Sequence, residues 1–294
     1  MGYCDFKLTA YADYSANLGR SYDVTTSRVT GQVYTSLSLN EDLNPRNFKM
    51  RECCNCEEHP NTIPVILALD VTGSMGDACS EVAAALGEIM KNLYEKFKDV
   101  EFCIMGIGDL SYDTAPIQMS QFESDIRIAE SLDKVWIEHG GGGNDFESYT
   151  AAWYMGLKRT KLDCYDKQQR KGIIITMGDE PLNPYLPKNS LNRAINDSVQ
   201  QDIETDKLYE EVREKFDVFH IAVDSPNSCY HYYKDKIEST FGKILGLNLK
   251  TSTINNLSKT IEECISESVN AIPTYEVVPD TNENKVNENG EIIW

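Results

Sequence analysis

The chain has 294 residues and carries 28 basic against 47 acidic side chains, so its formal net charge at pH 7 is -19. A charge of that sign and size repels nucleic-acid backbones and anionic lipid surfaces, and no cluster of Lys and Arg offsets it, so we expect neither as a partner. The length suits one large α/β domain with appendages.

The cysteine content and the N-terminal sequence bear on the compartment. The nine cysteines are an odd number, several lie within apolar helix or strand patterns, and the first residues contain no apolar signal region. These features predict a reduced, cytoplasmic protein. No apolar stretch approaches the ~20 residues that cross a bilayer, so we also expect a soluble chain that does not bind membranes.

Residues 1–62 form an N-terminal extension that is rich in Ser, Thr, Tyr and Asn. Side chains alternate in character from Val33 to Leu39, and this alternation predicts at least one strand or hairpin. The role of the extension does not follow from its composition.

The extension ends in the run Cys53-Cys54-Asn-Cys56-Glu-Glu-His59, whose thiols and imidazole are the ligands that zinc prefers. A structural zinc site normally has two separated ligand pairs. The donors available for a second pair are Cys4, Cys229 and His231. We favour a reduced, partly buried cysteine cluster over a zinc site.

Residues 63–270 alternate between strand and helix signals, which predicts an α/β fold with a doubly wound, mostly parallel sheet flanked by helices. Short apolar runs between turn signals mark the strands. We predict strands near 64–70, 100–107, 172–177 and 217–223, a short edge strand near 115–119 and a weak last strand near 247–253.

Helical periodicity fills the gaps between these strands. The strongest pattern runs from Val82 to Phe97, where apolar residues recur at three- and four-residue spacing and form one core-facing stripe. We predict further helices near 123–134, 147–159, 203–215, 233–245 and 255–269. The polar tail, residues 271–294, is predicted to be mobile, although its segment 275–278 has the composition of an added edge strand.

Three loops of the predicted sheet carry oxygen donors. The first, Asp70-Val-Thr72-Gly-Ser74, directly follows an apolar strand. The second is His139-Gly-Gly-Gly-Gly-Asn144-Asp145-Phe-Glu147-Ser, and the third is Gly178-Asp179-Glu180-Pro181, which also follows an apolar strand. Parallel strands deliver their carboxyl ends to one edge, so we expect the loops to meet there. Such oxygens suit a divalent cation such as Mg²⁺.

The three loops, in this order, resemble the metal ion-dependent adhesion site of von Willebrand factor A domains over roughly residues 63–269. Bacterial and phage-like members with a Gly-Asp-x-Pro third loop are more similar to this chain than integrins are. The resemblance implies that Thr72 and Ser74 bind the cation through their hydroxyls, while Asp70 and Asp179 act largely through water or hydroxyl hydrogen bonds. It also implies a binding module whose cation, Mg²⁺, Mn²⁺ or Ca²⁺, accepts an acidic side chain from a protein partner.

The chain departs from the family pattern in the first and second loops. Thr72 replaces a Ser, which keeps the hydroxyl. No Thr follows the glycines, so Asn144 or Asp145 would have to supply the second-loop ligand. A neutral Asn144 carbonyl would preserve the attraction for a partner anion, whereas a charged Asp145 would weaken it.

Other interpretations of the same residues stay open. The first loop alone is also typical of a helix cap. Asp109 and Asp224 follow apolar strands at the same edge, where we expect turn residues or acids that act indirectly. The main alternative function is a haloacid dehalogenase-like, Mg²⁺-dependent phosphatase or phosphotransferase with Asp70 as nucleophile, although the lysine and the second carboxylate of that chemistry are missing.

Overall fold

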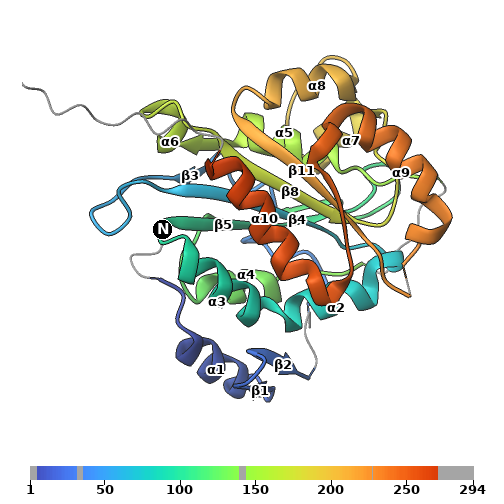
Figure 1. Ribbon diagram of the computed structural model, residues 1–294. Helices are drawn as coiled ribbons and strands as arrows, with labels where there is room; N and C mark the ends of the chain where they lie inside the picture. Colours follow the sequence, from blue (N-terminus) through green and yellow to red (C-terminus); the bar gives the residue numbers. More distant parts are fainter. Residues whose placement is uncertain (1–4, 32–35, 139–143, 227, 271–294) are drawn as a thin grey trace, which may run out of the picture.

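The computed structural model describes residues 5–31, 36–138, 144–226 and 228–270, with the backbone alone at Ser74, Gly76 and Asp77. The expectations for the tail and for most of the glycine run therefore lie outside the described residues. Figure 1 shows a central sheet with helices on both sides and a small N-terminal unit packed below one helical layer.

The central sheet confirms the predicted fold class. Its strand order is β12-β11-β8-β4-β5-β6, all neighbours pair in parallel except β5 with β6, and β6 is therefore an antiparallel edge strand. The strands are β4 (Ile63–Asp70), β5 (Val100–Ile107), β6 (Ile117–Met119), β8 (Gly172–Gly178), β11 (Phe216–Val223) and β12 (Leu249–Ser252). All six lie within one or two residues of the predicted ranges.

The central strand β4 is apolar because both faces of the sheet are covered. Val65, Leu67 and Leu69 pack into one hydrophobic core, and Ile66 and Ala68 pack into the other. No apolar residue of β4 is exposed, and polar side chains lie where the strand ends at the carboxyl edge of the sheet.

Two helical layers cover the sheet (Figure 1). One layer contains α2 (Gly76–Ala84), α3 (Leu86–Lys96), α4 (Arg127–Asp133) and α10 (Leu257–Asn270). The other contains α5 (Thr150–Arg159), α7 (Lys188–Ile195), α8 (Thr205–Val212) and α9 (Tyr230–Leu245). The predicted helical regions are present, with shorter bounds in most cases.

The predicted helix from Val82 to Phe97 is divided into two, with the break at Ala85. The N-terminal unit packs at this break: the Tyr11 hydroxyl donates a hydrogen bond to the Ala83 carbonyl at 3.3 Å. A Cβ on Gly87 would lie 2.4 Å from the Ser27 carbonyl oxygen, so the unit approaches the start of α3 more closely than any larger residue allows.

The N-terminal extension contains a hairpin, as predicted, but this hairpin precedes the alternating segment. The structure has helix α1 (Leu8–Asn17) and the hairpin β1 (Ser21–Asp23) and β2 (Arg28–Thr30), whereas residues 36–39 lie in no strand and 32–35 fall outside the described residues. The sequence did not predict α1 because its apolar residues form no pronounced stripe, and the helix is stabilised by tertiary contacts. Arg20 fixes the unit to the body through two hydrogen bonds to Asp133, at 2.8 and 2.5 Å.

Short elements outside the main sheet were not predicted. They are β3 (Arg51–Cys53), β7 (Thr160–Leu162), α6 (Asp163–Asp166), β9 (Tyr185–Leu186), helix α7, β10 (Ile203–Glu204) and three 3₁₀ turns at Gly73–Met75, Gly246–Asn248 and Ile254–Asn256. β3 pairs with β7 in parallel, which ties the end of the extension to the body. Among the described residues, no helix has the length and apolar character needed to cross a membrane.

Candidate metal centre

The first and third loops meet at the carboxyl edge of the two central strands. Asp70 is the last residue of β4 and Asp179 follows β8, and the register pairs Leu69 with Met177. Both carboxylates are fully buried. Burial and, next, the negative charge of Asp179 raise the pKa of Asp70 to about 7. The predicted convergence of these two carboxylates is therefore present.

The hydroxyl of Thr72 is held against Asp70. The Thr72 hydroxyl and backbone N–H both donate to Asp70 Oδ1, at 2.6 and 3.0 Å. A hydroxyl that donates its proton in this way still has lone pairs for a cation. The side chain of Ser74 lies outside the described residues, so its predicted role as a ligand stays a prediction.

Tyr149 is a site residue that the sequence analysis did not identify. Its hydroxyl donates to Asp70 Oδ2 at 2.7 Å, so both oxygens of Asp70 accept hydrogen bonds from hydroxyl groups. Gly178 makes room for it, since a Cβ there would lie 2.0 Å from the Tyr149 oxygen. The glycine directly before Asp179 was the available signal, but only the fold shows which side chain it accommodates.

The two residues proposed for the second-loop ligand make other contacts. Asn144 donates from Nδ2 to Asp109 Oδ2 at 2.5 Å. Asp145 is exposed and forms an ion pair with Lys236 at 2.7 Å. No contact of the described residues joins either side chain to Asp70 or Asp179, and residues 139–143 fall outside the described ranges.

Glu147 is the second residue that sequence reasoning missed. The residue is 3% exposed, and its Oε2 is buried without a hydrogen-bond partner in the described structure. Burial and the negative charges of Asp70 and Glu180 raise its pKa to about 11. A β-bridge between Glu147 and Leu182 joins the second loop to the third. Its only sequence signal was its place just before a predicted helix.

The third loop adds a second acid beside Asp179. The backbone N–H of Cys229 donates to Asp179 Oδ2 at 2.6 Å and so brings the start of α9 to the site. Burial and the charges of Asp70 and Asp179 raise the pKa of Glu180 to about 8. The acids at this edge therefore oppose one another's ionisation.

The donor set fits a hard divalent cation. Carboxylate and hydroxyl oxygens are the ligands such ions take, and a positive ion would offset the mutual repulsion of the buried acids. Within the described ranges, no three His, Cys, Asp or Glu side chains are arranged to hold one ion together. Thr72 would therefore hold the ion together with carboxylate oxygens, and water molecules would complete its coordination.

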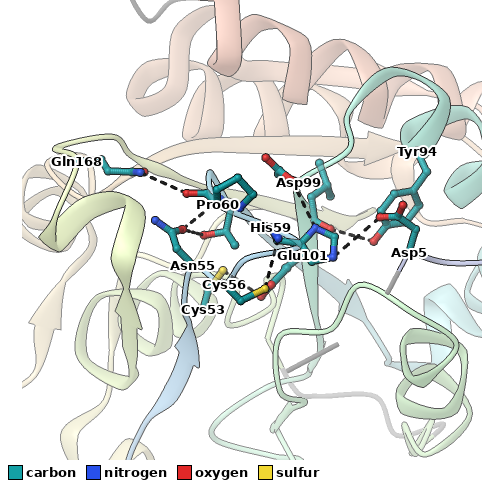
Figure 2. Close-up of polar contacts among 12 residues, drawn as sticks. Asp5, Cys53, Asn55, Cys56, His59, Pro60, Tyr94, Asp99, Glu101 and Gln168 are labelled. Carbon is teal, nitrogen blue, oxygen red and sulfur yellow. Dashed lines mark hydrogen bonds and ion pairs between the residues drawn. The ribbon is translucent and has the colours of Figure 1, made fainter. Parts of the chain in front are cut away.

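The cysteine run at the end of the extension does not form a zinc site within the described residues. Figure 2 shows that Cys53 donates from Sγ to Glu101 at 3.2 Å, while the His59 backbone N–H donates to Cys56 Sγ at 3.3 Å. The His59 ring lies between Asp99 and Asp5, at 3.4 and 4.0 Å. Burial and the nearby Glu101 raise the pKa of Cys53 well above its usual value, which opposes the thiolate that zinc requires.

The two further acids at the edge, Asp109 and Asp224, make contacts of different kinds. Asp109 accepts a hydrogen bond from the Ser111 backbone N–H at 2.6 Å, as in an Asx turn. Asp224 lies 3.4 Å from the His231 imidazole. The Asp109 contact matches the expectation of a turn residue, and Asp109 in addition anchors Asn144.

Comparisons with known proteins bear on the fold. No family model and no curated protein matches the chain. The chain is similar to the pilus adhesin SpaC from Lactobacillus rhamnosus GG in its open conformation, with TM-score 0.51, 11% identity, and coverage of 74% of this chain and 31% of the adhesin. It thus spans about a third of that protein.

Weaker similarities connect the chain to two further structures. The vWF domain of the type V pili tip protein Mfa5 from Porphyromonas gingivalis has TM-score 0.45 and 11% identity, with 71% of this chain and 95% of that domain covered. Proximal thread matrix protein 1 from the mussel byssus has TM-score 0.42 and 12% identity, with coverage of 70% and 47%. The strand order and the two helical layers, together with the likeness to SpaC, give the chain a doubly wound α/β fold similar to a part of that adhesin.

Proposed function

We propose that the chain is a non-enzymatic, adhesion-type protein-binding module whose attachment to a partner requires a divalent cation. The cation would be Mg²⁺, with Mn²⁺ or Ca²⁺ as alternatives, held by Thr72 and Ser74 and supported by Asp70 and Asp179. The observation that carries the proposal is the buried pair of acids at the edge, with the hydroxyl of the buried Thr72 bonded to Asp70.

A bound cation would supply a positive charge to which a carboxylate of the partner can attach. Asp70 supports this arrangement by orienting the Thr72 hydroxyl, because that hydrogen bond directs its proton inward and its lone pairs away from Asp70. Tyr149 fixes the other Asp70 oxygen and so prevents the carboxylate from rotating. The likeness to a pilus adhesin supports this kind of module but not a particular partner.

The geometry gives no support to the phosphatase alternative. A nucleophilic Asp70 would need an oxygen that substrate can reach, yet its side chain is fully buried and both of its oxygens accept hydrogen bonds. These contacts suit Asp70 to orienting neighbouring groups and not to attacking a substrate.

The proposal is tested with a panel of short peptides in which each Asp or Glu peptide has an Asn or Gln counterpart. We expect the chain in Mg²⁺ to retain some of the acidic peptides and none of their amide counterparts, and EDTA to release them. Thr72→Val replaces the hydroxyl with a methyl group of similar size and should abolish retention without unfolding the chain.

Circular dichroism and thermal melting establish that the Thr72→Val variant is folded. Ser111→Ala, at an exposed position on another loop, is the matched control and should bind as the unsubstituted chain does. Retention that is unchanged in EDTA, or equal for acidic and amide peptides, contradicts the proposal.

A further inference from the structure

We propose that Glu147 is the second-loop ligand of the cation and binds it directly through its carboxylate, in the place that Asn144 or Asp145 was expected to fill. This inference rests on the proposed function and names one residue of its site. Glu147, Asn144 and Asp145 each carry a side-chain oxygen that can bind a cation, and their contacts in the structure distinguish them.

The position of Glu147 is fixed by the fold. It immediately precedes the turn that leads into α5, and its β-bridge to Leu182 holds it beside the third loop. Tyr149, two residues further on, bonds to Asp70 across the site. The backbone around Glu147 is therefore attached to both of the loops that carry the buried acids.

Among the described side chains of this loop, the Glu147 carboxylate is the one with a buried oxygen that has no hydrogen-bond partner. It is more than nine-tenths buried, and its Oε2 has no hydrogen-bond partner among the residues that the structure describes. Buried polar groups are normally paired, so an unpaired carboxylate oxygen at this depth indicates a missing partner.

The surroundings of Glu147 show that the missing partner is positive. The largest charges that act on it are negative and belong to Asp70, Glu180, Asp113 and Asp109. Lys236, a base at this edge, is paired with Asp145 at the surface. A cation among these acids would compensate Glu147 and its neighbours together.

The alternative ligands are engaged elsewhere. Asn144 uses its amide to hold Asp109, and Asp145 is exposed and bonded to Lys236. A cation at Asp145 would have to displace Lys236, and the bond from Asn144 Nδ2 fixes the Asn144 side chain against Asp109, whereas Glu147 would gain a partner without losing one.

A carboxylate ligand has a consequence that a neutral one lacks. It raises the affinity for the cation in the absence of any partner, because the ligand itself supplies negative charge. The chain should therefore bind Mn²⁺ or Mg²⁺ on its own, and this can be measured without knowing the partner.

The experiment compares Glu147→Gln with Asn144→Ala and Asp145→Asn by calorimetric titration with Mn²⁺. The unsubstituted chain should bind one ion, Glu147→Gln should weaken binding by more than about 10-fold, and the two control variants should change it by less than about 3-fold. The Gln side chain has the same shape, so the comparison isolates the charge.

Thermal melting supplies a second readout. In EDTA, Glu147→Gln should melt at a higher temperature than the unsubstituted chain, because the folded state no longer has to bury an acid beside other acids, and Mn²⁺ should no longer raise its melting temperature. A purely structural role for Glu147 would give a lower melting temperature and an undiminished shift with Mn²⁺, which overturns the inference.

The outcomes separate this inference from the proposed function. If Glu147→Gln binds Mn²⁺ as the unsubstituted chain does and Asn144→Ala or Asp145→Asn loses it, the inference is overturned while the cation-dependent module stands. If the unsubstituted chain binds no divalent ion by either readout, both are overturned.

Discussion

At the scale of single residues, the candidate site is organised around Asp70. Hydroxyl groups from two loops hold its two oxygens, Thr72 on one side and Tyr149 on the other. Such supporting hydrogen bonds orient the groups that contact a metal, and their loss commonly weakens metal binding by roughly 10- to 100-fold.

Tyr149→Phe is therefore expected to weaken Mn²⁺ binding by roughly 10- to 100-fold while the fold is kept. Titration calorimetry measures the affinity, and circular dichroism checks the fold. Tyr154→Phe, in α5, is the matched control, because that hydroxyl bonds to Asp197 and not to the site. Equal affinities for the two variants would contradict the role assigned to Tyr149.

His220 gives the fold a dependence on pH. Burial lowers its pKa to about 3, and its ring stacks on Phe241 with the centroids 3.6 Å apart. In the unfolded chain its pKa is about 6.5, so between these values the unfolded state binds the proton more readily. The stability contributed by neutral His220 is full above pH 6.5 and falls as the pH is lowered toward 3.

We expect His220 protonation to cost about 2–3 kcal/mol of unfolding free energy by pH 4.5. The measurement is urea unfolding in EDTA at a series of pH values for the unsubstituted chain and for His220→Gln. The buried acids of the site act in the opposite sense, so the difference between the two chains isolates the histidine. Parallel curves for both would refute this assignment.

At the scale of elements, the N-terminal unit packs where the helical segment after the first loop is interrupted. Tyr11 and Ser27 of the unit meet Gly87 at the start of α3, and a Cβ there would lie 2.7 Å from the Tyr11 ring. The unit thus contacts the helical segment that directly follows the candidate metal loop.

Gly87→Ala tests whether the higher helix propensity of Ala or a clash with the N-terminal unit determines the change in stability. In a helix without such contacts, Ala stabilises by up to ~1 kcal/mol relative to Gly. Here the clash with the N-terminal unit should reverse the sign and cost about 1–3 kcal/mol. Urea unfolding measures the change, and faster amide exchange in residues 8–30 locates it.

Gly242→Ala in α9 is the control, because its Cβ would have a nearest neighbour at an ordinary 3.7 Å. It should leave stability unchanged or slightly raised. A stabilising effect at Gly87 as well would show that the packing of the unit is looser than described.

The elements that the sequence predicted share one property. β4, β5, β8 and β11 are buried on both faces, so their composition alone identifies them. The elements it missed, such as α1 and the pair β3 and β7, are short or weakly patterned and depend on partners distant in sequence.

The residues of the candidate site divide in the same way, into those that local sequence predicts and those that depend on distant contacts. Asp70, Thr72 and Asp179 follow strands and could be predicted, since strand ends fix where the next residues lie. Glu147 and Tyr149 belong to the turn that precedes α5, and their place in the site depends on how that helix packs. No local pattern carries that information.

At the scale of the whole molecule, the charge of -19 creates a field that concentrates cations. We expect the affinity for Mn²⁺ to fall several-fold as choline chloride is raised from 0.05 to 0.5 M, because salt screens charges beyond about 10 Å at 0.1 M. Calorimetry measures the affinity, and choline is too large to compete for the ion itself. If the affinity for Mn²⁺ does not change with salt, only the charges within the site contribute to it.

The central claim is that oxygens from separate loops meet at one edge of the sheet to hold a cation. Anomalous diffraction from crystals soaked in Mn²⁺ tests this most directly. The account predicts a single strong peak beside Thr72 and the Glu147 carboxylate, at the edge where β4 and β8 end. No peak at that edge, or a peak only among Cys53, Cys56 and His59, would contradict it.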